Sequence, residues 1–212
     1  MNYSILSLEK LSNYLAEESG RDQEVILYGL QILSSVLMGY VFLIIISWAL
    51  GIFVPVITAA LTSSIFRAFS GGAHASSKLR CSIIGLLILI PIGFCAKYTY
   101  VAIYPLINYI VLFVVLCGIY VIYKYVPADT PQKPINSTLQ KKVLKTVSMV
   151  LFMIWIIVCF LLSNKTNNPF VALLVYASTL GMFWQLVSVT PWGYKFVDNI
   201  DHILQLSKER RD

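Results

Sequence analysis

The chain has 212 residues, of which 58% are hydrophobic and only 12% are charged. A soluble domain carries about 25% charged residues, and a soluble fold of this length could not bury so much apolar surface. The composition therefore excludes a soluble fold and indicates one membrane-embedded domain over residues 1–212. The net charge is +6, but the basic residues flank apolar segments, which indicates membrane topology rather than binding to nucleic acid.

The first expected element is an amphipathic helix over residues 1–24, whose apolar residues recur every three or four positions among charged ones. A helix of this kind lies on the membrane surface. Six apolar segments follow within residues 32–190, and they predict an all-α, polytopic bundle of about six transmembrane helices. Their approximate ranges are 32–50, 52–66, 82–96, 100–123, 147–162 and 170–190.

The second and third of these segments are short. Each has about 15 residues, or roughly 22 Å of helix, whereas a span needs about 20 residues to cross about 30 Å of hydrocarbon. Short spans predict local thinning of the bilayer, or a polar connection between them that dips below the headgroups into a protein cavity.

The distribution of Lys and Arg predicts an orientation. If the N-terminus lies inside and six spans alternate, all but two of the 16 basic residues fall on the inside, the exceptions being Lys97 and Lys165. The positive-inside rule favours this arrangement. We therefore expect both termini to be cytoplasmic, together with the loops 67–81 and 124–146.

Four cysteines are present, and three of them, Cys95, Cys117 and Cys159, lie inside apolar runs. A free cysteine in such a run behaves as a small hydrophobic residue. Their spacing matches neither a disulfide framework nor a paired-cysteine zinc motif. We therefore expect no metal and no cofactor.

The loop 67–81 is the densest polar feature of the chain. It contains His74, one of only two histidines, and Cys81, the only cysteine outside an apolar run. Close in space, such a pair supplies a nucleophile and its base, because the thiolate is the attacking species. On these residues alone, the alternative is a cytoplasmic loop with an incidental histidine.

The spacing of the pair requires a break in the helix. Seven residues of straight helix rise about 10.5 Å, whereas a hydrogen bond between the two side chains needs about 3 Å. Gly71–Gly72 permits a turn, and Ser76 or Ser77 is a good N-cap. We expect a helix starting near Ser77 that places Cys81 in or just after its first turn, where the helix dipole favours a thiolate.

This loop resembles a motif of the accessory gene regulator B family of bacterial quorum-sensing membrane peptidases. The family pattern is a basic residue, a glycine, a His-Ala pair and a cysteine seven residues after the histidine. The matching residues are Arg67, Gly72, His74, Ala75 and Cys81. A second stretch, YVPADTPQKPI at 125–135, also resembles the family, although residues 130–132 are less basic than in many relatives.

The resemblance implies a cysteine endopeptidase of the bacterial cytoplasmic membrane. Cys81 would attack the scissile carbonyl of a small precursor peptide, with His74 as base, to give an acyl-thioester enzyme. A Cys or Ser inside the precursor would then displace Cys81 and close a thiolactone or lactone ring, which forms an autoinducing peptide. The implied precursor has an amphipathic N-terminal helix and an acidic C-terminal tail.

Three further residues are supporting candidates. Gln31, in the first span, either donates to the oxyanion or orients His74, or it is an interfacial residue bonded to water or headgroups. Arg67 either anchors its span at the inner surface, or stabilises the loop or holds precursor carboxylates. Gly72 allows the turn.

The loop 124–146 carries a cluster of lysines with two possible roles. They either bind anionic lipids or dock the acidic tail of the precursor; the four are Lys133, Lys141, Lys142 and Lys145. Asp129 is a weaker candidate for orienting His74. Near the C-terminus, we assign Asp198, Asp201 and His202 to a solvated helix face rather than to a metal site.

Two other function classes remain open from the sequence. In a peptide exporter or small transporter without protease activity, Gln31, Arg67 and His74 would line a path, although no inverted repeat supports it. The other class is a noncatalytic membrane scaffold. Faster alkylation of Cys81 than of the other three cysteines would favour the peptidase. Small bundles with short spans often associate, so we also expect a homodimer.

Overall fold

The computed structural model describes residues 2–128, 137–163 and 168–209. The described residues are almost entirely helical, and within them the only β-type pairing is an isolated bridge between Gly71 and Ala128. The predicted all-α class is confirmed. The helices are α1 Asn2–Ser19, α2 Gln23–Ala49, α3 Phe53–Ser70, α4 Lys78–Ile103, the short 3₁₀ helix η1 Tyr104–Leu106, α5 Ile107–Tyr125, α6 Thr138–Ser163, α7 Pro169–Ser188 and α8 Pro191–Glu209.

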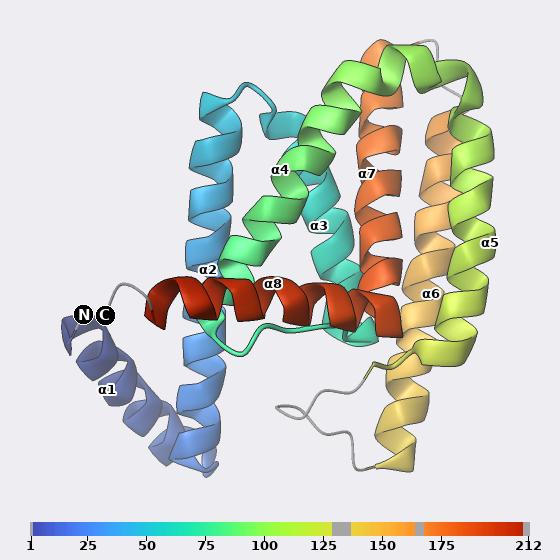
Figure 1. Cartoon of the computed structure of the whole chain (residues 1–212). Helices are drawn as coiled ribbons and strands as arrows, with labels where there is room; N and C mark the ends of the chain where they lie inside the picture. The colour runs from blue at the N-terminus through green and yellow to red at the C-terminus, as the bar shows by residue number, and fades with distance from the viewer. Residues whose placement is uncertain (1, 129–136, 164–167, 210–212) are drawn as a thin grey trace.

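The apolar helices α2 to α7 run between the two ends of the molecule (Figure 1). Helices α1 and α8 lie at the same end, and α8 crosses the direction of the bundle. By length and composition, five of the described helical stretches can span a membrane, and one of them, Lys78–Tyr125, is 48 residues long. That stretch combines α4 and α5, which run in opposite directions on either side of η1 in Figure 1. Six crossings with cytoplasmic termini stay a prediction.

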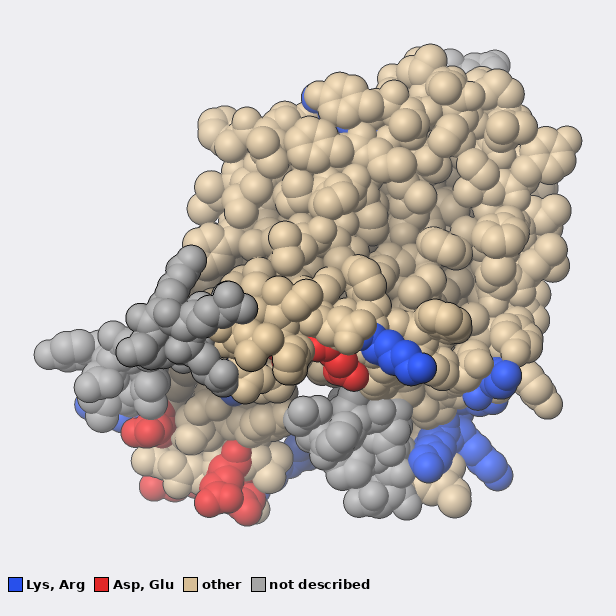
Figure 2. Space-filling view, viewed as in Figure 1, with Lys and Arg blue, Asp and Glu red and all other residues tan. Residues whose placement is uncertain are grey.

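The outer surface of the bundle is apolar, as a lipid-facing surface requires. Figure 2 shows the Lys, Arg, Asp and Glu side chains gathered at the end that carries α1 and α8, with very few over the body of the bundle. Long apolar side chains along α2, α5 and α6 are exposed. In water such a surface would lead to association, so these helices belong in a membrane.

The prediction of two short spans is wrong for the second of them. Its helix α4 has 26 residues, or about 39 Å, whereas α3 has 18 residues, or about 27 Å, and is still slightly shorter than a full span of about 20 residues. The apolar run of α4 is bounded by charged residues, but the helix continues through them. At its far end the Lys97 side chain bends out so that Nζ donates to Gly51 O at 2.8 Å. The length of α4, which follows the 67–81 segment, therefore gives no reason to place that segment below the headgroups.

Close packing of α3 against α7 positions the site. These two helices make the most extensive contact in the fold, because small residues face each other: a Cβ at Gly181 would lie 2.4 Å from the carbonyl oxygen of Ala59. Both helices end at the same end of the bundle, at Ser70 and Ser188. The chain that leaves α3 is therefore built directly against the C-terminus of α7.

Candidate active site

The predicted break in the helix is present between Ser70, which ends α3, and Lys78, which begins α4. We call the non-helical residues 71–77 the connecting loop. Gly71 and Gly72 open it with φ values of +73° and +136°, which side-chain-bearing residues rarely adopt. A Cβ at Gly72 would also lie 2.8 Å from Ser188 Oγ. Both backbone angle and space therefore require glycine at this turn.

The predicted helix start is also confirmed. Ser77 is the N-cap of α4, and its side chain accepts a hydrogen bond from Arg80 N at 3.2 Å. Cys81 N donates to Ser77 O at 2.9 Å, so Cys81 ends the first turn of α4. Its thiol is partly buried, and His74 is exposed on the connecting loop. The two residues thus lie on either side of a capped helix start, and their direct pairing stays a prediction.

Arg67 lies beneath the connecting loop. Its Nη2 donates to Ala73 O, and its Nη1 lies 3.5 Å from both Gln185 Oε1 and Ser188 Oγ. Its guanidinium is also close enough to Cys81 for an electrostatic interaction between the two side chains. Arg67 therefore joins the loop to the bundle interior, and its position favours loop stabilisation over anchoring at the membrane surface.

Gln185, on α7, is the central residue of this buried polar group and was not identified from the sequence. It is only 1% exposed. Its Nε2 donates to Ser70 Oγ at 3.0 Å and to Gly71 O at 2.8 Å, and its Oε1 accepts from Ser188 Oγ at 3.1 Å. Because an unpaired buried amide is costly, these bonds fix how α3 and α7 meet. A polar residue inside an apolar span was the available signal, since such residues face the bundle interior.

Gln31 is placed near the loop, but through a lysine. It lies well inside α2, and its Oε1 accepts a hydrogen bond from Lys78 Nζ at 2.7 Å. The same Nζ lies 5.4 Å from the centre of the Tyr28 ring. Gln31 therefore helps to connect α2 to the start of α4, and a direct role with His74 or an oxyanion stays a prediction.

The predicted loop 124–146 is shorter in the structure. Helix α5 continues to Tyr125, and α6 begins at Thr138, because the lysine-rich residues after Thr138 are good helix formers. Lys133 and Asp129 lie outside the described residues.

The three remaining lysines of the predicted cluster lie on the first turns of α6. Lys141 and Lys142 are exposed. Lys145 instead contacts α5. Its Nζ donates to the backbone oxygen of Tyr123 at 2.6 Å and lies 5.1 Å from the centre of the Tyr123 ring. Lys141 and Lys142 are therefore the two described members whose charges face solvent or headgroups.

The assignment of Asp201 to a solvated helix face is wrong. Asp201 is 8% exposed, because α8 turns it toward the connecting loop, where it accepts from Ser76 and pairs with Arg80. Burial acts to raise the pKa of Asp201, but the bonds from Ser76 and the charge of Arg80 outweigh it and hold that pKa below its usual value. Asp198 and His202 are exposed, as expected. No group of three or more His, Cys, Asp or Glu among the described side chains is arranged to hold a metal.

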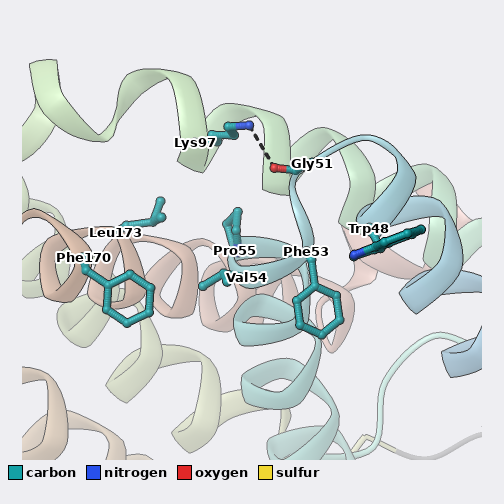
Figure 3. A pocket seen from close by; sticks show the side chains of 8 residues that line it. All are labelled: Trp48, Gly51, Phe53, Val54, Pro55, Lys97, Phe170 and Leu173. Carbon is teal, nitrogen blue, oxygen red and sulfur yellow. Dashed lines mark hydrogen bonds between the residues drawn. The ribbon is translucent and has the colours of Figure 1, made fainter.

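A pocket of about 350 Å³ lies at the opposite end of the helices from the connecting loop. Figure 3 shows it between the α2–α3 turn, α4 and α7, with aromatic side chains such as Trp48, Phe53 and Phe170 around it and the Lys97–Gly51 hydrogen bond at one edge. Lys97 supplies the charged side chain of its lining, and its Nζ donates to Gly51 O. The chemistry-bearing side chains are gathered at the other end.

Comparisons with known proteins give the same family that the motif in residues 67–81 resembles. The family model Accessory gene regulator B matches residues 8–189. An AgrB-like protein of Clostridium perfringens (strain SM101) is 30% identical over 205 residues, which cover 94% of this chain and 95% of the relative. Accessory gene regulator protein B of Staphylococcus aureus (strain MW2) is 25% identical, over 85% of this chain and 95% of the relative. An AgrB-like protein of Listeria welshimeri is 26% identical, over 80% and 78%. No solved structure gives a significant match.

Proposed function

Because the chain belongs to the accessory gene regulator B family, we propose that it is a membrane cysteine endopeptidase that processes a small quorum-sensing precursor peptide. The observation that carries this proposal is the helix break before Ser77. It places Cys81 in the first turn of α4 and His74 on the preceding loop. A helix N-terminus favours an anion, so it favours the thiolate that a nucleophilic cysteine needs.

The proposed reaction starts with transfer of the Cys81 proton to His74. The thiolate attacks the scissile carbonyl of the precursor, and the peptide C–N bond breaks as the C–S bond of an acyl thioester forms. The imidazolium returns its proton to the leaving amine, which becomes the N-terminus of the released C-terminal fragment.

In the second half of the reaction, a Cys or Ser side chain inside the precursor attacks the thioester. His74 accepts the proton of that thiol or hydroxyl, whose sulfur or oxygen replaces Cys81 on the acyl carbon and closes a thiolactone or lactone ring. Cys81 leaves as a thiolate and takes the proton back from His74. No oxidant or cofactor is needed, because each step exchanges one acyl bond for another. Partial burial of Cys81 supports cyclisation, since limited water access disfavours hydrolysis of the thioester.

The precursor is expected to approach from the end of the bundle that carries α1 and α8. Lys141 and Lys142 present their charges at that end, and an acidic C-terminal tail would complement them. Anionic lipid headgroups compete for the same lysines. A second copy of the chain is a further proposed partner.

Co-expression with a short candidate precursor that has an internal Cys or Ser and an acidic C-terminal tail, followed by mass spectrometry, tests the proposal. We expect the wild-type chain to release the C-terminal fragment and to form a product lighter by one water than the linear N-terminal fragment. Cys81→Ala and His74→Ala should lose this activity, whereas Cys117→Ala, which changes a cysteine of α5, should retain it. Unchanged cleavage by Cys81→Ala in membranes that contain normal amounts of protein would contradict a cysteine endopeptidase.

A further inference from the structure

Helix α8 covers the connecting loop from outside the bundle. Its apolar face packs on the loop and on α4: Val197 of α8 is buried in one cluster with Ala73 and Ile84, and Ile200 and Leu204 pack against the same cluster. Figure 1 shows α8 lying across the bundle end beside the chain that joins α3 to α4. Position 189 ends the match to the family model, so α8 lies beyond the matched residues.

One polar side chain of α8 points into this contact. Asp201 Oδ2 accepts hydrogen bonds from Ser76 N, at 3.1 Å, and from Ser76 Oγ. Its Oδ1 lies 2.7 Å from Arg80 Nε. Arg80 Nη2 in turn donates to Ser76 Oγ, so Asp201, Ser76 and Arg80 form a closed network of three side chains.

The two residues that contact Asp201 lie close to His74 and Cys81 along the chain. Ser76 follows His74 by two residues, and Arg80 directly precedes Cys81. At its other end, the connecting loop is tied to α7 and α3 through Ala73, whose N donates to Ser188 O and whose O accepts from Arg67. His74 therefore lies between two anchored points, of which the second is supplied by α8.

We propose that Asp201 is a positioning residue for the His74–Cys81 pair, acting through Ser76 and Arg80. This rests on the proposed function. A nucleophile and its base must be held to within about 0.5 Å of their productive geometry, and a seven-residue loop reaches that precision only when both ends are fixed. Helix α8 thus completes the site from outside the transmembrane bundle.

Asp198, on the same helix, provides a matched control. It precedes Asp201 by three residues and is exposed, so Asp198→Asn removes the same charge from α8 without touching the loop. Asp201→Glu keeps a carboxylate, and Asp201→Ala removes the links of α8 to both Ser76 and Arg80. The order of activity expected from positioning is wild type and Asp198→Asn first, then Asp201→Glu, and Asp201→Ala last.

The test uses the full chain in membrane vesicles and measures two quantities. The first is precursor cleavage, for which we expect Asp201→Ala to lower kcat on the order of 100-fold, the effect of a displacement of about 1 Å, with KM within about twofold of wild type. The second is the alkylation rate of Cys81 without precursor, relative to Cys95, which is exposed on α4. We expect this ratio to fall in Asp201→Ala and to recover in part in Asp201→Glu.

The outcomes separate this proposal from the function on which it rests. Unchanged kcat and an unchanged Cys81 to Cys95 ratio in Asp201→Ala would overturn the positioning role while Cys81-dependent cleavage continues. An equal loss in Asp198→Asn, or slower alkylation of both cysteines together, would overturn it in favour of a general structural role. Failure of the proposed function would instead show as wild-type cleavage that persists in Cys81→Ala, and the alkylation ratio still tests Asp201 in that case.

Discussion

Gly72 is constrained twice, by its backbone and by its surroundings. Its φ of +136° is costly for any residue with a side chain, by about 1–3 kcal/mol, and an added Cβ would lie 2.8 Å from Ser188 Oγ. We expect Gly72→Ala to displace the connecting loop and to reduce precursor cleavage on the order of 100-fold, measured as initial rate per amount of protein in vesicles.

Gly85 of α4 is the matched control for this prediction. A Cβ there meets no atom within 4 Å, and alanine is the better helix former. Gly85→Ala should therefore retain wild-type cleavage. Equal activity of Gly72→Ala and the wild type would show that the turn is not needed for the reaction.

Individual residues were predictable only where their role is local. The turn at Gly71–Gly72 and the cap at Ser77 depend on neighbours in sequence, and both were predicted. Gln185 and Asp201 depend on contacts with α3 and with the connecting loop, more than 100 positions away along the chain. Asp201 is of a residue type that is usually exposed, but its helical spacing from Val197 and Leu204 places it on the apolar face of α8, which was the available signal that distinguishes it from Asp198.

Among the elements, helix identity was easier to predict than helix length. Hydropathy identifies where apolar residues cluster, so all six apolar segments correspond to helices. Hydropathy underestimates the length of α4, because charged residues at a helix end stay in the helix and extend their side chains outward. Lys97 does so toward Gly51 O. The same limitation made the 124–146 loop too long.

The docking of α8 is expected to weaken in acid. The folded-state pKa of Asp201 lies below its usual value, so the carboxylate contributes stability above the unfolded-state pKa of about 3.9 and loses it as the pH falls through the lower folded-state value. Arg80 stays charged throughout this range. We expect hydrogen exchange of α8 amides to speed up below about pH 4 relative to Asp201→Asn at the same pH.

The comparison at equal pH removes the intrinsic pH dependence of exchange, and exposed Asp198 and His202 are present in both proteins. Asp201→Asn should exchange faster than wild type at neutral pH, and the difference should vanish in acid. A pH-independent difference would show that the Asp201 ionisation does not hold α8 in place.

For the whole molecule, the charge distribution predicts which end faces the cytoplasm. Tyr98, near the far end of α4, is 68% exposed, and Leu139, at the start of α6, is 70% exposed. In a variant without native cysteines, we expect a membrane-impermeant maleimide to label Tyr98→Cys in intact cells and Leu139→Cys only after permeabilisation. Labelling of Leu139→Cys in intact cells would reverse the predicted orientation.

The central claim is that Cys81 carries the precursor as an acyl thioester, and the mass of the chain during turnover tests it most directly. The substrate is the precursor with its internal Cys or Ser replaced by Ala, which blocks ring closure. We predict a rise in intact mass equal to the N-terminal fragment less one water, located at Cys81 by peptide mapping and removed by hydroxylamine. Release of the C-terminal fragment with Cys81 unmodified, and with its adduct absent at every time point, would contradict the mechanism.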